Sequence, residues 1–439
     1  MVKKKILLIS PRNQNYAKKL FPPLSLTNIA AYIPEKYDIQ IIDENLEKIQ
    51  FDADLVAVTV NTCTARRAYE IANEWTQLKI PVILGGIHPT VLPSEAEKYS
   101  TSVVIGESEE IWTSLLNDFE KDALKKRYHA SLFNFKKTNV RLPRRDFLKK
   151  RYIFESLETV RGCPFNCHFC SVTRFYGGRY RFKPLKMIEK EIESMNKKSL
   201  FIVDDNLIGF GSIAEKRTLE LLNLLKEYDL TWMGQASVNV AENEEILRLA
   251  NESGCMFLFL GFESINHGFL STFNKQINLR RGVASYKNTI NTLHDYNINV
   301  MGSFIIGSDF DSPQSLSLLE DFIINSDIDI PNLTILTPYP GTKLYETLLA
   351  QNRLFNPQWW LENPLPLFTF KPKNLTVQHL AHLYYKFINN LNGLQRSLKR
   401  LIKSLITNHS LKKAMFSLTE NIINGNNYKR MIRENVKKR

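Results

Sequence analysis

Two series of short apolar runs, separated by stretches of helical character, dominate this chain. Five runs rich in Ile and Val lie within residues 1–115, and six more lie within residues 151–345. The first five are mostly unbroken by polar residues, which is typical of strands buried on both faces of a parallel sheet. Strands that alternate with helices in this way form α/β folds. We therefore predict an α/β protein built from parallel sheets.

The two series predict two domains, and a length of 439 residues suits two or three domains. We expect a Rossmann-like sheet first, and after a basic linker without sustained periodicity a partial (β/α)6 barrel. A helical C-terminal region follows. The expected boundaries are 1–120 for the first domain, 121–150 for the linker, 151–345 for the barrel and 346–439 for the helical region.

Small and polar residues follow the strands of the first series. They include Asn61 and Thr62, Gly85 and Gly86, and Glu107. In a doubly wound sheet, ligands bind beyond the carboxyl ends of the strands. Adjacent glycines also let the backbone approach a ligand closely. These loops are therefore the predicted ligand side of the first domain.

The N-terminus places three lysines before an apolar run, as a signal peptide does. The run from Ile6 to Ile9 is shorter than the roughly seven residues of a signal-peptide core, and Pro11 follows it. No run in the chain approaches the roughly 20 apolar residues of a membrane span. We therefore expect a first β-strand here and a cytoplasmic protein.

The net charge of +13 is concentrated in residues 391–439, which carry twelve Lys and Arg against Glu420 and Glu434. The rest of the chain is nearly neutral, so a uniformly basic nucleic-acid surface is not expected. Basic and apolar residues interleave at helical spacing in residues 397–403. Such a helix is usually a solvated surface helix, but it also suits a substrate lid or peripheral contact with an anionic membrane.

Three of the five cysteines form the pattern C-x3-C-x2-C at Cys163, Cys167 and Cys170. Thiolates are the usual protein ligands of iron-sulfur clusters. Three thiolates on one loop can hold three irons of a [4Fe-4S] cube, which leaves the fourth iron open to a substrate or cofactor. The loop directly follows the first predicted barrel strand, at the catalytic end of a β/α barrel.

Two alternatives remain for the cysteines. A zinc site needs a fourth ligand, and His168 is the only nearby candidate. Structural cysteines are the other alternative, and this is the expected role of Cys63 and Cys255, which lie in or beside apolar runs.

The segment CPFNCHFC, at the head of a six-unit β/α pattern, resembles the radical S-adenosylmethionine enzymes. The resemblance implies that Cys163, Cys167 and Cys170 ligate a [4Fe-4S] cluster. It further implies that S-adenosylmethionine chelates the fourth iron and is cleaved by one electron to methionine and a 5′-deoxyadenosyl radical. That radical abstracts hydrogen from unreactive carbon, whereas the protein supplies placement and dryness.

The same resemblance implies further contacts to S-adenosylmethionine. Phe169 matches an aromatic residue near the adenine, and polar residues at barrel strand ends match the methionyl, ribose and carboxylate contacts. The residues concerned are Phe169, Asp204, Gln235, Glu263, Ser303 and Pro340. For Asp204 and Glu263 the alternative is a carboxylate that caps a strand end or helix. The sequence names no catalytic residue beyond these contacts.

Segments of the first domain, among them VILGGIHPTVLPSEA and VVIGESEEIW, resemble the cobalamin-binding domain of the cobalamin-dependent subfamily. The contacts that the resemblance implies are Asn61, Thr62, Thr64, Gly85, Gly86, His88 and Glu107. Ordinary loop and cap polarity is the alternative for each of them. The D-x-H-x-x-G motif that supplies a lower histidine to cobalt is absent, so the lower ligand stays open.

This architecture implies C-methylation of an unactivated carbon in a small-molecule, lipid or natural-product intermediate. A rearrangement or ring-forming reaction and a non-catalytic cobalamin or iron-sulfur regulator are the alternatives. Methylthiolation is not expected, because that family carries an N-terminal cysteine triad and this domain has only Cys63. The expected partners are the substrate and an electron donor such as a flavodoxin or ferredoxin.

Overall fold

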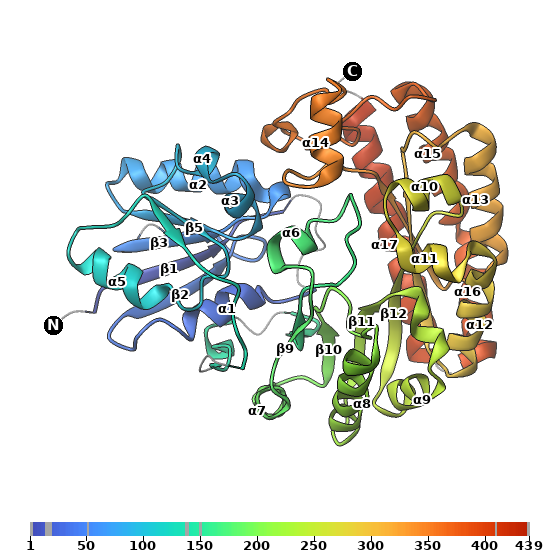
Figure 1. Ribbon diagram of the computed structural model, residues 1–439, viewed down its shortest axis with the longest axis horizontal. Helices are drawn as coiled ribbons and strands as arrows, with labels where there is room; N and C mark the ends of the chain where they lie inside the picture. Colours follow the sequence, from blue (N-terminus) through green and yellow to red (C-terminus); the bar gives the residue numbers. More distant parts are fainter. Residues whose placement is uncertain are drawn as a thin grey trace.

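The computed structural model describes residues 3–13, 20–50, 52–136, 140–148, 152–408 and 411–436. Two α/β units lie side by side (Figure 1): the N-terminal sheet with its helices is on one side, and the second sheet with its helices is on the other. The C-terminal helices pack against the second unit. The chain is therefore an α/β protein of the predicted class.

The N-terminal unit contains a six-stranded parallel sheet in the order β2-β1-β3-β4-β5-β6. Its strands are β1 (Lys5–Ser10), β2 (Asp38–Asp43), β3 (Leu55–Thr59), β4 (Val82–Gly85), β5 (Ser102–Ile105) and β6 (Arg127–His129). The first five coincide with the predicted runs.

Strand β6 was not predicted, because it falls in the segment expected to be a linker. It is an edge strand of three residues in which only Tyr128 is buried, while Arg127 and His129 are exposed. A strand this short, with one apolar residue, produces no apolar run for the sequence pattern to detect.

Alternate residues of the central strands enter two separate cores. Leu7 and Val56 pack on one face with α2, whereas Ile6 and Leu55 pack on the other face with α1 and α5. This two-sided burial explains why the strands carry unbroken apolar runs. The helices of this unit are α1 (Leu24–Ala30), α2 (Ala65–Gln77), α3 (Ile87–Val91), α4 (Pro93–Ala96) and α5 (Trp112–Glu120).

The second unit is an open, six-stranded parallel sheet in the order β7-β10-β11-β12-β13-β14. Its strands are β7 (Glu155–Leu157), β10 (Ser199–Ile202), β11 (Thr231–Ala236), β12 (Cys255–Glu263), β13 (Asn299–Ile306) and β14 (Ile330–Ile335). Strands β7 and β14 are its edges, so the predicted partial (β/α)6 barrel is confirmed. The predicted first run, residues 157–161, is divided between β7 and a second short strand.

That second strand, β8 (Val160–Arg161), pairs antiparallel with β9 (Arg181–Phe182), and the cysteines lie on the chain between them. The barrel helices are α6 (Val172–Tyr176), α7 (Leu185–Glu193), α8 (Ser212–Lys226), α9 (Glu244–Glu252), α10 (His267–Thr272), α11 (Gln276–Arg281), α12 (Tyr286–Asp295), α13 (Pro313–Asn325) and α14 (Lys343–Ala350). The 3-10 helices are η1 (Thr62–Thr64), η2 (Arg145–Phe147), η3 (Val238–Glu242), η4 (Val283–Ser285) and η5 (Trp359–Leu361).

The C-terminal region ends in three helices, α15 (Val377–Leu391), α16 (Leu394–Asn408) and α17 (Leu411–Val436). Helix α17 covers the amino end of the barrel, where the Phe416 ring lies 5.0 Å from that of Phe257 and the side chains of Ser417 and Asn421 donate to the carbonyl of Asp329. Among the described residues, no helix combines the length and the apolar character that crossing a bilayer requires.

Candidate functional site

A cavity of about 430 Å³ lies between the two units, at the carboxyl ends of β1, β3, β4 and β5. The N-terminal unit contributes the predicted residues Asn61, Gly85, Gly86 and Glu107 to its lining. The barrel unit contributes lining residues from the segment before the cysteines, including Arg161, and from the end of β10. The cavity is therefore built by both units together, and four of the predicted residues meet there.

The glycines at this cavity are required by the backbone. Gly86 has a φ of +110°, and a Cβ atom on it would lie 2.8 Å from the carbonyl oxygen of Val60. Gly106 has a φ of +96°, and a Cβ atom would strike the carbonyl oxygen of Ala130. Only glycine adopts such a conformation without strain. A bound molecule thus meets bare backbone at two strand ends.

Trp112 presents an orphaned donor at the same cavity. The side chain lines the cavity and is 2% exposed, at the start of α5. Its indole Nε1 is buried and has no hydrogen-bond partner within the part of the chain that the structure describes. A buried donor without a partner is unfavourable by about 1–3 kcal/mol. An acceptor group on a ligand in the cavity would satisfy it.

His88 lies elsewhere. It is fully buried, its Nε2 lies 3.1 Å from Oε1 of Glu95, and its ring packs 5.3 Å from that of Trp360. It is not among the residues that line the cavity. These contacts pack His88 between its own helix α3 and the C-terminal region, and its contact to cobalamin stays a prediction.

The two predicted threonines act within the loop after β3. Asn61 accepts a hydrogen bond from the backbone of Thr64 and closes a capping box around η1, and Thr62 and Thr64 are buried. Of the three, only Asn61 lines the cavity. The capping box gives Thr64 an ordinary cap role, and contacts of Thr62 and Thr64 to cobalamin stay predictions.

The cysteine loop (residues 162–170) is held by backbone hydrogen bonds to distant segments. The amide of His168 donates to the carbonyl of Phe273 at 3.0 Å, and the amide of Leu344 donates to the carbonyl of His168 at 3.0 Å. The Phe169 ring lies 6.0 Å from that of Phe273. These contacts fix the loop between α10 and α14.

The three thiols lie close enough to interact electrostatically. Burial raises the pKa of Cys163 to about 11 and that of Cys170 to about 12, and it also raises the pKa of Cys167. Neutral thiols are thus favoured until a positively charged metal group enters the site. Metal binding stabilises the thiolate form and releases these protons.

Among the described residues, no group of three or more His, Cys, Asp or Glu side chains is arranged to hold a single metal ion. Three thiolates that each hold a different iron of a cube do not need to converge on one point. The donor set fits an iron-sulfur cluster better than a single ion.

Lys275 is a residue of this site that the sequence analysis missed. Its Nζ lies 2.7 Å from Oε1 of Glu263, and both side chains are largely buried. Burial lowers the pKa of Lys275, but the attraction of Glu263 and of the Cys167 and Cys170 sulfurs raises it above its usual value. The predicted Glu263 therefore lies with the cysteines, together with a cation. A lone lysine in a helical stretch gave no sequence signal.

Asp204 holds the backbone just before the cysteine loop, where β7 leads into β8. Its Oδ1 accepts hydrogen bonds from the amides of Thr159 at 2.7 Å and Val160 at 3.1 Å, and its Oδ2 accepts from the Thr159 hydroxyl. It is 1% exposed, and burial raises its pKa to about 7. These contacts indicate a positioning role, and a direct contact to S-adenosylmethionine stays a prediction. The neighbouring Asp205 does line the cavity.

The remaining predicted barrel residues do not line the cavity. The carbonyl of Gln235 accepts from the amide of Leu207, and Ser303 Oγ lies 3.5 Å from Nδ2 of Asn332. Pro340 is buried in the loop after β14. Contacts of these three residues to S-adenosylmethionine stay predictions.

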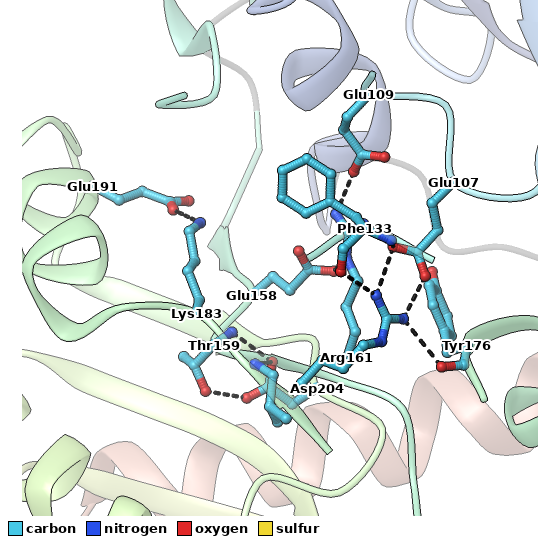
Figure 2. Close-up of polar contacts among 12 residues, drawn as sticks. Glu107, Glu109, Phe133, Glu158, Thr159, Arg161, Tyr176, Lys183, Glu191 and Asp204 are labelled. Carbon is cyan, nitrogen blue, oxygen red and sulfur yellow. Dashed lines mark hydrogen bonds and ion pairs between the residues drawn. The ribbon is translucent and has the colours of Figure 1, made fainter. Parts of the chain in front are cut away.

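Five charged side chains form a network between the two units (Figure 2). Glu107, which follows β5, contacts Arg161 at 2.7 Å and also pairs with Arg181, while Glu109 and Glu158 contact Arg161 at 2.6 and 2.9 Å. Each of the five side chains is less than 15% exposed. We call this set the bridging ion network. Glu107 thus lines the cavity and also forms ion pairs with two arginines of the barrel unit.

Comparisons with known proteins agree with this geometry. A model of the Radical SAM superfamily matches residues 157–322, and a model of the B12 binding domain matches residues 15–116. The chain is 29% identical to bacteriochlorophyllide d C-8(2)-methyltransferase of Chlorobaculum tepidum, over 92% of this chain and 97% of that protein. It is 30% identical to bacteriochlorophyllide d C-12(1)-methyltransferase of the same organism, over 91% of this chain and 90% of that protein.

Among solved structures, the fold is similar to that of OxsB, described as a cobalamin-dependent S-adenosylmethionine radical enzyme with aqua-cobalamin and S-adenosylmethionine bound. The TM-score is 0.71, the identity is 15%, and the match covers 96% of this chain and 72% of that chain. At this identity the likeness shows a shared fold.

Proposed function

Because the chain belongs to the cobalamin-dependent radical S-adenosylmethionine enzymes, we propose that it methylates an unactivated carbon on a large, apolar, ring-bearing small molecule. Its cofactors are a [4Fe-4S] cluster, S-adenosylmethionine and cobalamin. The observation that carries the proposal is the shared cavity, whose lining passes from the strand ends of the first unit to Arg161, two residues before the first cysteine. A methyl carrier held in the cavity and a radical source held beside it can act on the same substrate carbon.

The cysteine loop is the site for the cluster. Cys163, Cys167 and Cys170 would hold three irons, and Lys275 would balance part of the negative charge that three thiolates bring. Glu263 keeps the lysine ammonium in place through its 2.7 Å contact. The chain leaves no fourth thiolate here, since Cys63 and Cys255 lie outside the loop.

The cavity is the site for cobalamin. Gly86 and Gly106 leave bare backbone at the cavity wall that the corrin would meet, and Trp112 would donate its indole N–H to an acceptor on cobalamin. Leu8 and Val58 belong to an apolar part of the lining that excludes water. When bound, the cluster with S-adenosylmethionine supplies a hydrogen-abstracting carbon radical and cobalamin supplies a methyl carrier.

The substrate class rests on the two relatives that match this chain over at least 90% of their length. Both are named as methyltransferases of bacteriochlorophyllide d, a tetrapyrrole. We therefore propose tetrapyrroles as the first substrates to test. An apolar lipid or another polycyclic intermediate remains within the same proposal.

The test uses the full chain, reconstituted anaerobically with iron, sulfide and hydroxocobalamin. It is incubated with a reductant, bacteriochlorophyllide d and S-adenosylmethionine that carries a deuterated methyl group. The expected result is 5′-deoxyadenosine and a product that has gained the deuterated methyl group. A product without label would favour a ring-forming or rearrangement reaction. No 5′-deoxyadenosine from a chain with an intact cluster would favour a non-catalytic regulator.

An electron donor such as a flavodoxin or ferredoxin of the cytoplasm completes the proposal, because cleavage of S-adenosylmethionine consumes an electron. We also propose peripheral contact of α16 with an anionic membrane. Leu398 and Ile402 are 40% and 56% exposed on this helix, and Lys399 is exposed beside them. Co-sedimentation with phosphatidylserine vesicles at low and high salt tests the contact, and the absence of salt-sensitive binding would end it.

A further inference from the structure

The bridging ion network joins a residue of the cavity wall to the β8–β9 ribbon that flanks the cysteine loop. Glu107 is 5% exposed and lines the cavity, and its two carboxylate oxygens are both occupied by guanidinium groups. It also accepts a hydrogen bond from the amide of Phe133 at 3.0 Å. The carboxylate is therefore fully satisfied by the protein and has little capacity left for a direct ligand contact.

The two arginines that hold Glu107 flank the cysteines in the chain. Arg161 in β8 and Arg181 in β9 are register partners in the antiparallel ribbon, and the cysteine loop begins directly after Arg161. Gly162 has a φ of +85°, and a Cβ atom on it would strike the carbonyl of Arg179. The start of the loop is thus packed tightly against the ribbon, and a shift of Arg161 is passed to Cys163.

The cavity side of the connection is equally rigid. Gly106 is fixed by its surroundings. Its amide donates to the Thr90 hydroxyl at 3.0 Å, and its Cα faces the carbonyl of Ala130. Glu107 follows directly. A ligand that occupies the cavity therefore acts on a short and stiff path from Glu107 to Arg161 rather than on a mobile loop.

We propose that Glu107 is a positioning residue that couples occupancy of the cobalamin cavity to the binding of S-adenosylmethionine at the cysteine loop. The inference rests on the cavity and the cluster site and not on the methyl acceptor. Charge counting indicates that the coupling can be removed without destroying the fold. The network holds three carboxylates against two guanidinium groups, and Arg161 keeps Glu109 and Glu158 when Glu107 loses its charge.

The test compares the full-length wild-type chain with Glu107→Gln, both reconstituted with an oxidised cluster so that no turnover occurs. Anaerobic equilibrium dialysis gives the dissociation constant of radiolabelled S-adenosylmethionine with and without hydroxocobalamin. In the wild type we expect hydroxocobalamin to change this constant by about five-fold or more. Linkage requires S-adenosylmethionine to change the constant of hydroxocobalamin by the same factor.

Glu107→Gln is expected to reduce both factors to about one while iron and sulfide content stays at the wild-type level. Glu95→Gln is the matched control. Its carboxylate lies in the same domain, is 10% exposed and also contacts residues of the C-terminal region, at Gln358 and Trp360, but no contact joins it to Arg161 or Arg181 of the β8–β9 ribbon. This variant should keep the wild-type coupling.

Equal coupling in Glu107→Gln and the wild type overturns the proposal, as does an equal loss in Glu95→Gln or no coupling in the wild type. Should Glu107→Gln fail to fold, Arg181→Lys replaces it. Lysine keeps the charge but loses the two-pronged contact to Glu107. We expect a reduced but measurable coupling in this variant, and unchanged coupling would overturn the proposal in the same way.

Discussion

Nζ of Lys275 lies 2.7 Å from Oε1 of Glu263, and the pair sits beside the Cys167 and Cys170 sulfurs. Glu263 is the last residue of β12 and has a φ of +65°, whereas Lys275 lies in the turn before α11. A Cβ atom on Gly261 would strike the carboxylate. A cation is therefore held at the only place where three thiolates gather in the described chain.

The two members of this pair should respond differently to substitution. Lys275→Met leaves Glu263 beside the cysteines with no cation, and we expect it to lose most of its cluster during reconstitution. Glu263→Gln leaves the lysine next to the thiolates, which still balance it, so the cluster should be retained. Removing one partner of a buried pair destabilises a protein by about 3–5 kcal/mol. Iron and sulfide per chain and the thermal midpoint measure both effects, and equal cluster content in the two variants would contradict the argument.

Cys167→Ala should abolish the cluster without unfolding the barrel. The loop stays anchored through the backbone of His168, whose amide donates to the carbonyl of Phe273 and whose carbonyl accepts from the amide of Leu344. We expect iron and sulfide to fall to background, 5′-deoxyadenosine to disappear and hydroxocobalamin binding to persist. The control is Cys255→Ala, which removes a buried thiol at the start of β12, the end far from Glu263. This variant should keep the cluster. A full cluster in Cys167→Ala would refute the ligand assignment.

Asp204 should make the stability of the chain depend on pH. Burial raises its pKa to about 7 in the fold, above the value of about 4 in an unfolded chain. The folded state thus binds the extra proton between these values, and stability falls as the pH rises from about 4 to about 7. Asp204→Asn removes this contribution and keeps an acceptor for the amides of Thr159 and Val160. As the pH rises from about 4 to about 7, the thermal midpoint of Asp204→Asn should therefore rise relative to that of the wild type.

A second variant, Asp204→Ala, is expected to lower the stability of the chain. Asp204→Ala leaves the buried amides of Thr159 and Val160 without an acceptor, which is unfavourable by about 1–3 kcal/mol for each group. Thermal unfolding at pH 5 and pH 8 compares the three proteins. The same pH dependence in Asp204→Asn and the wild type would contradict the assignment of the proton to this residue.

Adjacent glycines at the cavity form a matched pair. Gly86→Ala forces alanine into a φ of +110° with its Cβ 2.8 Å from the carbonyl of Val60, so we expect a loss of about 1–3 kcal/mol and weaker cobalamin binding. Gly85→Ala places its Cβ 3.8 Å from that of Val104, an ordinary contact, and should leave stability unchanged. Thermal unfolding and titration with hydroxocobalamin measure both. Equal stability of the two variants would show that the backbone at Gly86 relaxes.

Trp112 gives a prediction in which binding and stability separate. Trp112→Phe keeps a large ring in the cavity wall but removes the buried N–H without a partner. The chain without cobalamin should be as stable as the wild type or more stable, by up to about 3 kcal/mol. Hydroxocobalamin should bind about three- to ten-fold more weakly, because one net hydrogen bond is lost. Unchanged affinity would mean that the indole donates to no acceptor on the ligand.

The sequence alone determined where most of the parallel strands lie along the chain and how the three clustered cysteines are spaced. Unbroken apolar runs predict buried parallel strands because a strand that is buried on both faces needs an apolar residue at nearly every position. Nine of the twelve described parallel strands coincide with predicted runs over nearly their full length, and β14 does so over four of its six residues. The spacing of Cys163, Cys167 and Cys170 is local as well. It therefore predicts a cluster with an open corner before any fold is known.

Tertiary structure decided which polar side chains meet. Glu107 and Arg161 are 54 residues apart in the chain, and Glu263 and Lys275 are 12 residues apart, yet each pair is in direct contact. No local pattern encodes such contacts, because a carboxylate at a strand end is equally suited to a cap, an ion pair or a ligand. For the same reason the sequence could not show that His88, a predicted cobalamin contact, lies buried against Glu95, or that Asp204, a predicted cofactor contact, holds the backbone of Thr159. The fold selects among these roles through the partner that packing brings within reach.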